Sequence, residues 1–154
     1  MKPLHHHGRL ALAIVTAAAA LFCTVVVAVP IAEAHGWAPA AWIRFGLRPA
    51  CHQIPDRCLD LGWGHLPVCA RCAGLYVGGL LGLGFSLLVN RRVRPSLGWF
   101  IAVTIPSALD LAFGPLGLPN LSNWPRFGIS LLPGAALGLL LACAIDDLSK
   151  PDSG

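Results

Sequence analysis

Residues 51–72, CHQIPDRCLDLGWGHLPVCARC, carry most of the reactive side chains of this chain and separate its first apolar segment from three others. The stretch contains four of the six cysteines, two of the six histidines and two arginines. Thiols and imidazoles at this density indicate a metal site, a redox site or a disulfide framework. Because the flanking segments are strongly apolar, we expect the stretch to lie at one end of a bundle of membrane helices.

The composition is that of a membrane protein. Hydrophobic residues make up 56% of the 154 residues, only 12% are charged, and the mean hydropathy is +0.69. Soluble domains carry about 25% charged residues. The formal net charge of +4 comes from basic residues spread over termini and connecting segments, without a basic helix face, which argues against a nucleic-acid partner. We therefore expect one compact unit whose main partner is the lipid bilayer.

Four apolar segments are long enough to be transmembrane helices. Residues 10–29 are uncharged and mostly apolar, and about 20 helical residues cross the ~30 Å of hydrocarbon. This segment is also a candidate signal anchor or signal peptide, since Ala32-Glu33-Ala34 resembles a cleavage site, although signal-peptide cores are usually about 7–15 residues long. The predicted fold class is an all-α bundle of four transmembrane helices. Residues 73–145 supply the other three, at 73–89, 97–113 and 127–145.

The distribution of lysine and arginine predicts the topology. Both types are denser in residues 1–9, 90–97 and 146–154 than in the segments on the other side, and cytoplasmic segments are usually the basic ones. We therefore expect a multi-pass protein of the plasma membrane with cytoplasmic tails at 1–9 and 146–154. Residues 30–72 then form an outer loop that carries the Cys/His stretch outside the cytoplasm.

The outer loop begins with residues typical of the membrane surface. Trp37, Trp42, Arg44 and Arg48 are of the types that lie at the level of lipid headgroups. A short interfacial helix, a re-entrant piece or a plain loop is consistent with residues 30–50.

Glycines predict where two helices touch. Gly74, Gly78 and Gly82 are four residues apart and share one helix face, and Gly134 with Gly138 repeats the spacing in the last apolar segment. Small residues at this spacing let neighbouring backbones approach closely.

The first interpretation of the cysteine stretch is a metal site. Cys69 and Cys72 form a CxxC pair, which supplies two thiolates in the geometry that tetrahedral zinc prefers. Cys51 and His52 complete the candidate ligand set, and the zinc-like ion is the expected cofactor. Cys58 and His65 are optional ligands. Haem attachment is disfavoured because Ala73, not histidine, follows the CxxC pair.

Two other interpretations use the same cysteines. A CxxC pair at a helix N-terminus, beside Arg71, favours thiolate, so Cys69 and Cys72 are the catalytic candidates of a membrane thiol–disulfide oxidoreductase. Such an enzyme would pass electrons to a quinone, with Cys51 as exchange partner. Alternatively, disulfides outside the cytoplasm would only hold the outer loop together, as in a structural or assembly subunit.

Five further polar residues are expected to form a pocket beside the thiols, because the predicted topology brings them to the same membrane face. Asp110 lies in an apolar segment, where a carboxylate is costly without a partner, and Arg126 is the expected partner. The alternative places Asp110 at a water-facing helix end. Arg57 and Arg71 either bind an anion, such as phosphate or a lipid headgroup, or simply reach the headgroups. The expected pocket residues are Arg57, Arg71, Asp110, Asn123 and Arg126.

The motif CHQxPxR at residues 51–57, followed by PVCARCxGxYxG at residues 67–78, resembles the signature of the membrane-protein family domain of unknown function 2085. Asp110 and the NxxRxG motif at residues 123–128 resemble its downstream part, so the likeness covers about residues 48–145. The resemblance implies a small prokaryotic integral membrane protein, implies no particular activity, and points to the candidate residues named above. Two positions depart from the expected pattern: Cys58 replaces a serine and Ala73 replaces a threonine.

Overall fold

The computed structural model describes residues 6–90, 93–113 and 122–149, and it is mostly helical. Helices α1, α3 and α5 are long and apolar enough to cross a membrane, and α4 is a shorter apolar helix of 17 residues. A helical membrane protein is therefore confirmed at this level. In chain order the elements are α1 (His6–Ala34), α2 (Pro39–Gly46), the 3-10 turn η1 (Pro55–Arg57), β1 (Cys58–Asp60), β2 (His65–Cys69), α3 (Ala70–Val89), α4 (Leu97–Phe113) and α5 (Asn123–Leu148).

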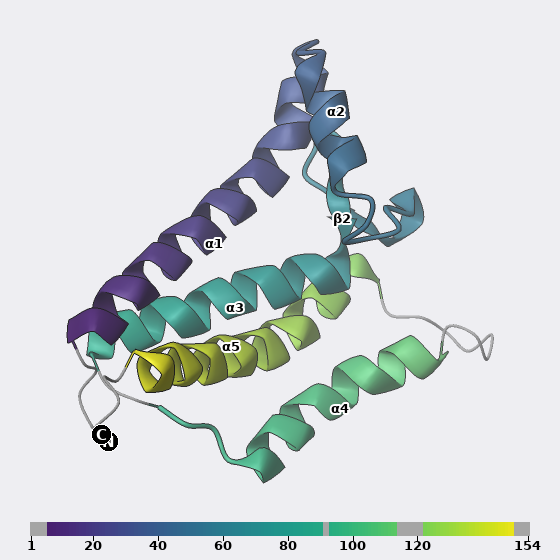
Figure 1. Ribbon diagram of the computed structural model, residues 1–154. Helices are drawn as coiled ribbons and strands as arrows, with labels where there is room; N and C mark the ends of the chain where they lie inside the picture. The colour runs from purple at the N-terminus through teal and green to yellow at the C-terminus, as the bar shows by residue number, and fades with distance from the viewer. Residues whose placement is uncertain (1–5, 91–92, 114–121, 150–154) are drawn as a thin grey trace.

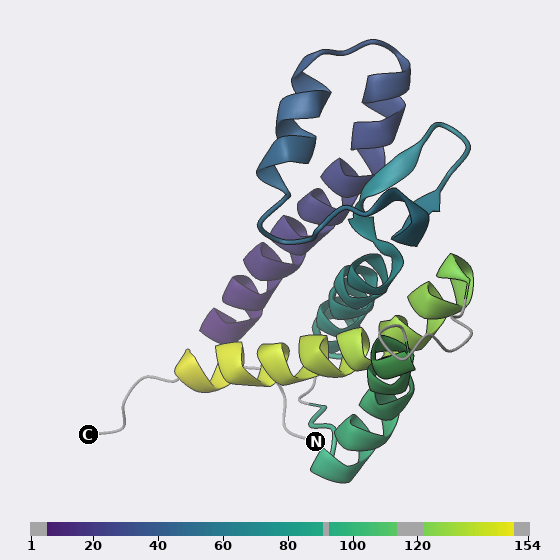
Figure 2. The ribbon, with the colours of Figure 1, turned by 90° about the vertical axis from the view of Figure 1, so that its right-hand side faces the viewer.

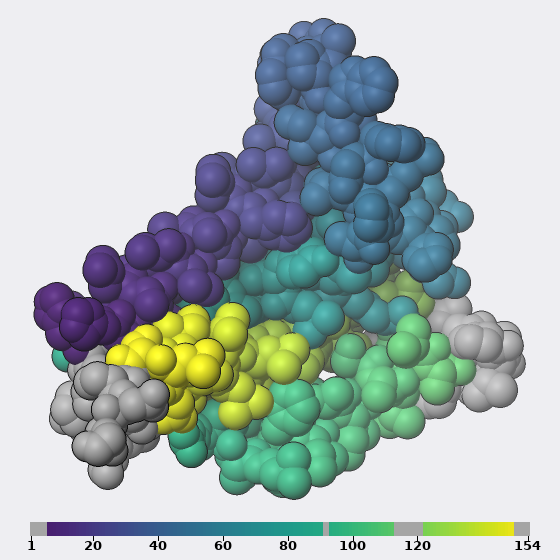
Figure 3. Space-filling model, in the orientation of Figure 1, coloured from purple at the N-terminus to yellow at the C-terminus, as the bar shows by residue number. Residues whose placement is uncertain are grey.

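Helix α1 runs in the opposite direction to α3 and α5 (Figures 1 and 2). Helix α1 begins, and α3 and α5 end, at one end of the molecule, whereas α2, the strands and the first residues of α3 and α5 lie at the other end (Figures 1 and 2). The surface view shows α2 and its neighbouring loop projecting beyond the helices at that second end (Figure 3). The whole Cys/His stretch is therefore at the end opposite to the start of α1.

Helices α3 and α5 make the most extensive contact in the structure, and glycines make it possible. A Cβ atom at Gly78 would overlap the backbone carbonyl of Leu131, and one at Gly134 would overlap the backbone of Leu75. The two backbones therefore approach as closely as the small-residue spacing predicts. This confirms the predicted packing face of each helix.

Helices α1, α3 and α5 extend beyond their predicted bounds, whereas α4 has the predicted ones. Helix α3 begins at Ala70, so that Cys72 lies in its first turn. Helix α5 begins at Asn123, so that both Asn123 and Arg126 are helical and do not belong to the segment predicted to connect the helices at 97–113 and 127–145. Within residues 30–50, the short helix α2 occupies Pro39–Gly46. These additional turns bring polar residues onto the rigid ends of the helices.

Within the predicted outer loop, the structure contains a short two-stranded antiparallel hairpin that the sequence analysis does not predict. Cys58 pairs with Cys69, and Asp60 pairs with His65. Its turn contains Gly62 at a φ of 86° and Gly64 at a φ of 123°, a region that favours glycine. The inward side chains of the hairpin pack with α1 and α3 in a buried apolar cluster that includes Val26, Leu59, Leu66, Val68 and Ala73.

Arg44 ties this end of the molecule together. Its Nε and Nη2 atoms donate to the Glu33 carboxylate of α1 at 2.8 and 2.6 Å, and Nη2 also donates to the His65 carbonyl oxygen at 2.8 Å. Gln53 Nε2 in turn donates to the Arg44 carbonyl oxygen at 2.7 Å. The Arg44 guanidinium therefore joins α1, α2 and the hairpin.

Candidate functional site

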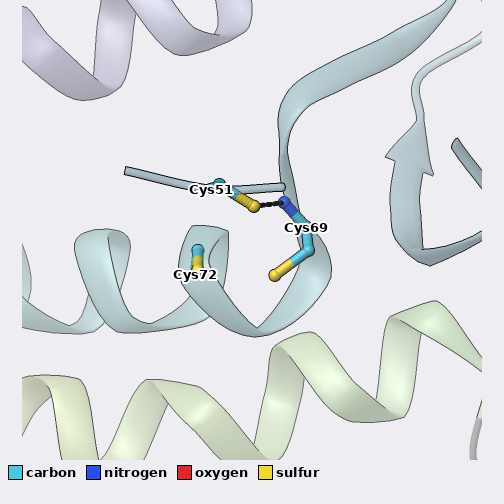
Figure 4. A group of neighbouring side chains, drawn as sticks. All are labelled: Cys51, Cys69 and Cys72. Atoms are coloured by element: carbon cyan, nitrogen blue, oxygen red, sulfur yellow. Dashed lines mark hydrogen bonds between the residues drawn. The ribbon is translucent and has the colours of Figure 1, made fainter. Parts of the chain in front are cut away.

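Three thiols meet where β2 passes into α3. The sulfur atoms of Cys51, Cys69 and Cys72 all lie within 4.8 Å of one another. Cys69 and Cys72 come from the start of α3, and Cys51 comes from a separate segment that crosses beside it (Figure 4). The Cys69 backbone N–H donates to the Cys51 sulfur at 3.1 Å. The fold thus brings together two parts of the chain that are 18 residues apart in sequence.

Local backbone geometry places the Cys51 thiol inward. The Cys51 N–H donates to the Leu47 carbonyl at 3.2 Å, which continues the turns that follow α2. Two residues later, Gln53 adopts a φ of 54°, in the left-handed region that non-glycine residues rarely occupy. Its side chain is held by the hydrogen bond to Arg44 described above. This bend leaves Cys51 buried and turns His52 to the surface.

Cys69 is held in an environment that favours thiolate. It occupies the N-cap position of α3. Hydrogen bonds from the Cys72 thiol and the Cys72 backbone amide, with smaller ones from Cys51 and the Arg71 amide, lower the pKa of Cys69 to about 5, although burial acts in the opposite direction. Hydrogen bonds to the charged form stabilise that form. Cys69 is therefore largely ionised near neutral pH when no metal is bound.

The remaining predicted ligands lie outside the group of three thiols. Among the residues that the structure describes, the group contains only Cys51, Cys69 and Cys72. His52 is exposed and lines the neighbouring cavity, and His65 is exposed with its ring 4.0 Å from the Asp60 carboxylate. Cys58 is buried and donates to the Ile54 carbonyl at 3.2 Å. Burial, with the nearby Cys51 and Cys69, raises the pKa of Cys58 to about 11.

A cavity of about 320 Å³ opens beside the thiols. Its wall includes all three cysteines and His52. Three arginines from three different elements also line it: Arg57 from η1, Arg71 from α3 and Arg126 from α5. The cavity therefore combines three thiols with three positively charged side chains.

Asp110 lies behind this wall and pairs with two of the arginines. Arg71 Nε donates to Asp110 Oδ2 at 2.7 Å, and Arg126 Nε lies 3.2 Å from the same oxygen. The carboxylate is buried, so the alternative of a water-facing Asp110 is wrong. The expected partner Arg126 is present, but the sequence did not indicate the closer partner Arg71.

Asn123, another expected pocket residue, has a different position. Its Nδ2 atom donates to the carbonyl oxygens of Asp56 at 3.1 Å and of Cys58 at 2.9 Å. It is not part of the cavity wall. Asn123 instead attaches the first turn of α5 to the backbone of η1 and β1, and so positions the loop that carries Arg57.

Comparisons with known proteins agree with this description. A family profile described as "Predicted membrane protein (DUF2085)" matches residues 51–140. An uncharacterized protein of Methanocaldococcus jannaschii is 32% identical over 87 residues, which are 54% of this chain and 56% of that protein. An uncharacterized protein of Methanothermobacter thermautotrophicus is 27% identical over 94 residues, which are 60% of this chain and 85% of that protein.

The matched region contains the three thiols, the arginines of the cavity and Asp110. This chain spans only about half the length of the first of these relatives. No solved structure matches the chain. Because the family profile covers more than half of the sequence, the chain belongs to the predicted membrane-protein family DUF2085.

Proposed function

We propose that this membrane protein binds a divalent metal ion of the zinc class through Cys51, Cys69 and Cys72. The observation that carries the proposal is the convergence of three sulfur atoms within 4.8 Å. Zinc–sulfur bonds of about 2.3 Å in a tetrahedral site place two sulfurs roughly 3.8 Å apart. Small side-chain shifts would therefore bring these thiols around one ion.

The third thiol favours a metal over a single redox pair. A CxxC disulfide needs only Cys69 and Cys72, whereas Cys51 is held by its own turn and accepts the Cys69 amide proton. Hydrogen bonds of this kind from backbone amides stabilise thiolate ligands. The fourth coordination position belongs either to His52, which follows Cys51 on the cavity wall, or to an exogenous ligand from the cavity.

The same proposal includes a membrane orientation. The thiols lie at the end of the bundle where α2 exposes Trp42 and the preceding turn exposes Trp37. Tryptophan is common at membrane interfaces. The basic residues of the sequence favour the opposite end as the cytoplasmic one, so the metal site would face outward from the plasma membrane with both termini inside.

Elemental analysis of protein purified without chelator or reductant tests the metal site. We expect about one zinc per chain in the wild type, and loss of that zinc in Cys51→Ser and Cys69→Ser. Cys23→Ser is the matched control, because Cys23 lies within α1 and outside the thiol group. Wild-type protein that contains no metal even after zinc is supplied would contradict the proposal.

A second candidate function is thiol–disulfide exchange with a quinone. The lowered pKa of Cys69 and its hydrogen bond from Cys72 favour this alternative. Oxidation of the Cys69 thiolate and the Cys72 thiol to a disulfide would release two electrons and one proton, which, with a second proton from water, reduce one quinone to the quinol. Reduced protein would then reduce a soluble ubiquinone analogue stoichiometrically, and Cys72→Ser would abolish this reaction. If the cysteines form disulfides that only hold the loop together, the purified protein would contain oxidised cysteines and would not reduce the quinone analogue.

A further inference from the structure

We infer that the cavity beside the thiols binds an anion that carries a phosphate group, held by arginine side chains next to the proposed metal. The cavity volume of about 320 Å³ is at the lower end of the range for small-molecule sites. Arg57, Arg71 and Arg126 reach its wall from three elements that are distant in sequence. Such convergence of guanidinium groups is the chemistry that recognises phosphate.

The arginines are not neutralised by the protein itself. Asp110 is the carboxylate that pairs with Arg71 and Arg126, so one negative charge serves two positive ones. The Arg57 side chain has no hydrogen-bond or ion-pair partner within residues 6–90, 93–113 and 122–149, and Arg57 is exposed at the cavity. Arg57 therefore retains a full set of donors for a ligand.

The inference rests on the proposed metal site because the thiols share the cavity with the arginines. With a metal bound, the three thiolates and Asp110 would carry four negative charges, against three positive charges on the arginines. The divalent ion would add two positive charges and leave the metal-bound site with a small net positive charge. If His52 does not coordinate the ion, its fourth coordination position would face the same cavity.

The phosphate has two sources with the same recognition chemistry: a lipid headgroup and a free phosphate compound. An apolar cavity of about 170 Å³ is lined by Ala73, Tyr76 and Phe127, the first and last of which directly follow Cys72 and Arg126 in the chain. The acyl chain of a lipid would fit the apolar lining of this second cavity. Both sources therefore belong in the test.

Isothermal titration calorimetry on zinc-loaded protein in a maltoside detergent tests the inference. The two probes are sodium phosphate and dihexanoyl phosphatidic acid, at constant ionic strength, with the zinc content of each sample measured in parallel. The variant is Arg57→Gln. The matched control is Arg48→Gln, because Arg48 is exposed nearby, packs over the Phe45 ring and is absent from the cavity wall.

We expect saturable binding of at least one probe by wild-type protein and by Arg48→Gln. Arg57→Gln should weaken it by about tenfold or more, the usual effect of removing a hydrogen bond to a charged group. The more tightly bound probe identifies the source. Zinc-loaded protein that binds neither probe, or Arg57→Gln that binds as wild type does, overturns the inference and leaves the metal site standing. Protein that takes up no zinc overturns the metal site instead.

Discussion

Arg71 binds both the side chain and the backbone of Asp110: its Nε and Nη2 donate to the carboxylate, the former at 2.7 Å, and Nη2 also donates to the backbone carbonyl at 3.0 Å. Arg71 stands between Cys69 and Cys72 in the chain, whereas Asp110 lies near the end of α4. The ion pair therefore anchors the turn that carries two of the three thiols. Arg71, the arginine within the CxxC motif, therefore forms its ion pair with Asp110 of α4 and not with a thiolate.

Asp110→Asn is expected to destabilise the protein. The substitution keeps the shape of the side chain but leaves Arg71 and Arg126 without a counter-charge in a buried position. Breaking a buried pair in this way costs about 3–5 kcal/mol of unfolding free energy. Thermal unfolding in detergent should show a clearly lower midpoint. Asp56→Asn is the control, since that side chain is exposed, and equal midpoints for the two variants would contradict the prediction.

Much of the helical layout could be predicted from the sequence, because long apolar runs can satisfy their backbone groups in a bilayer only as helices. The ends of those helices were harder to predict. Asn123 and Arg126 lie on either side of Trp124-Pro125, next to a segment rich in turn formers, yet Pro125 is compatible with the first turn of a helix. The hairpin was missed because β1 has only three residues, too few for a clear alternation.

The candidate site was predictable in residue types and less so in geometry. The CxxC spacing implies that Cys69 and Cys72 lie close together, but only the fold shows that Cys51 joins them. His52 was expected beside Cys51 as a ligand. The turn that ends at Cys51 and the bend at Gln53 leave Cys51 buried and His52 exposed. The pairing of Arg71 with Asp110 depends on where α4 packs, which spacing does not determine.

Substitutions at two glycines of α3 should have opposite effects. A methyl group at Gly78 would overlap the backbone of Leu131 in α5, whereas a methyl group at Gly84 meets nothing within 4 Å. Gly78→Ala is therefore expected to destabilise the protein by about 1–3 kcal/mol through overpacking. Gly84→Ala should be neutral or slightly stabilising, because alanine favours helices. Unfolding midpoints of both variants in one detergent test this, and a neutral Gly78→Ala would refute close packing of α3 on α5.

Cys69 and Cys58 should differ in their pH-dependent reactivity in metal-free protein. Only the thiolate is alkylated, and the pKa of Cys69 is lowered to about 5 while that of Cys58 is raised to about 11. Between pH 6 and 8, Cys69 is already ionised, so its alkylation rate should stay nearly constant and fall only as the pH drops through about 5. The Cys58 rate should be low and should rise about tenfold per pH unit.

Iodoacetamide labelling followed by peptide mass spectrometry measures both rates in the same sample. Cys58→Ser, which removes the slow site, serves to confirm the peptide assignment. A Cys69 rate that climbs steeply between pH 6 and 8 would mean that its thiol has an ordinary pKa, and the hydrogen bonds from Cys72 would then not stabilise the thiolate.

Asn123→Ala should loosen the hairpin end without unfolding the helices. The variant loses two hydrogen bonds from the amide to the carbonyl oxygens of Asp56 and Cys58, each worth about 0.5–1.5 kcal/mol. Amide hydrogen exchange should therefore accelerate in residues 55–60, and α3 and α5 should keep their protection. Ser122→Ala is the matched neighbour, because the Ser122 side chain makes no capping hydrogen bond. If Asn123→Ala exchanges no faster than Ser122→Ala, α5 does not hold the segment that carries Arg57, and the cavity wall depends on Arg44 and Gln53 instead.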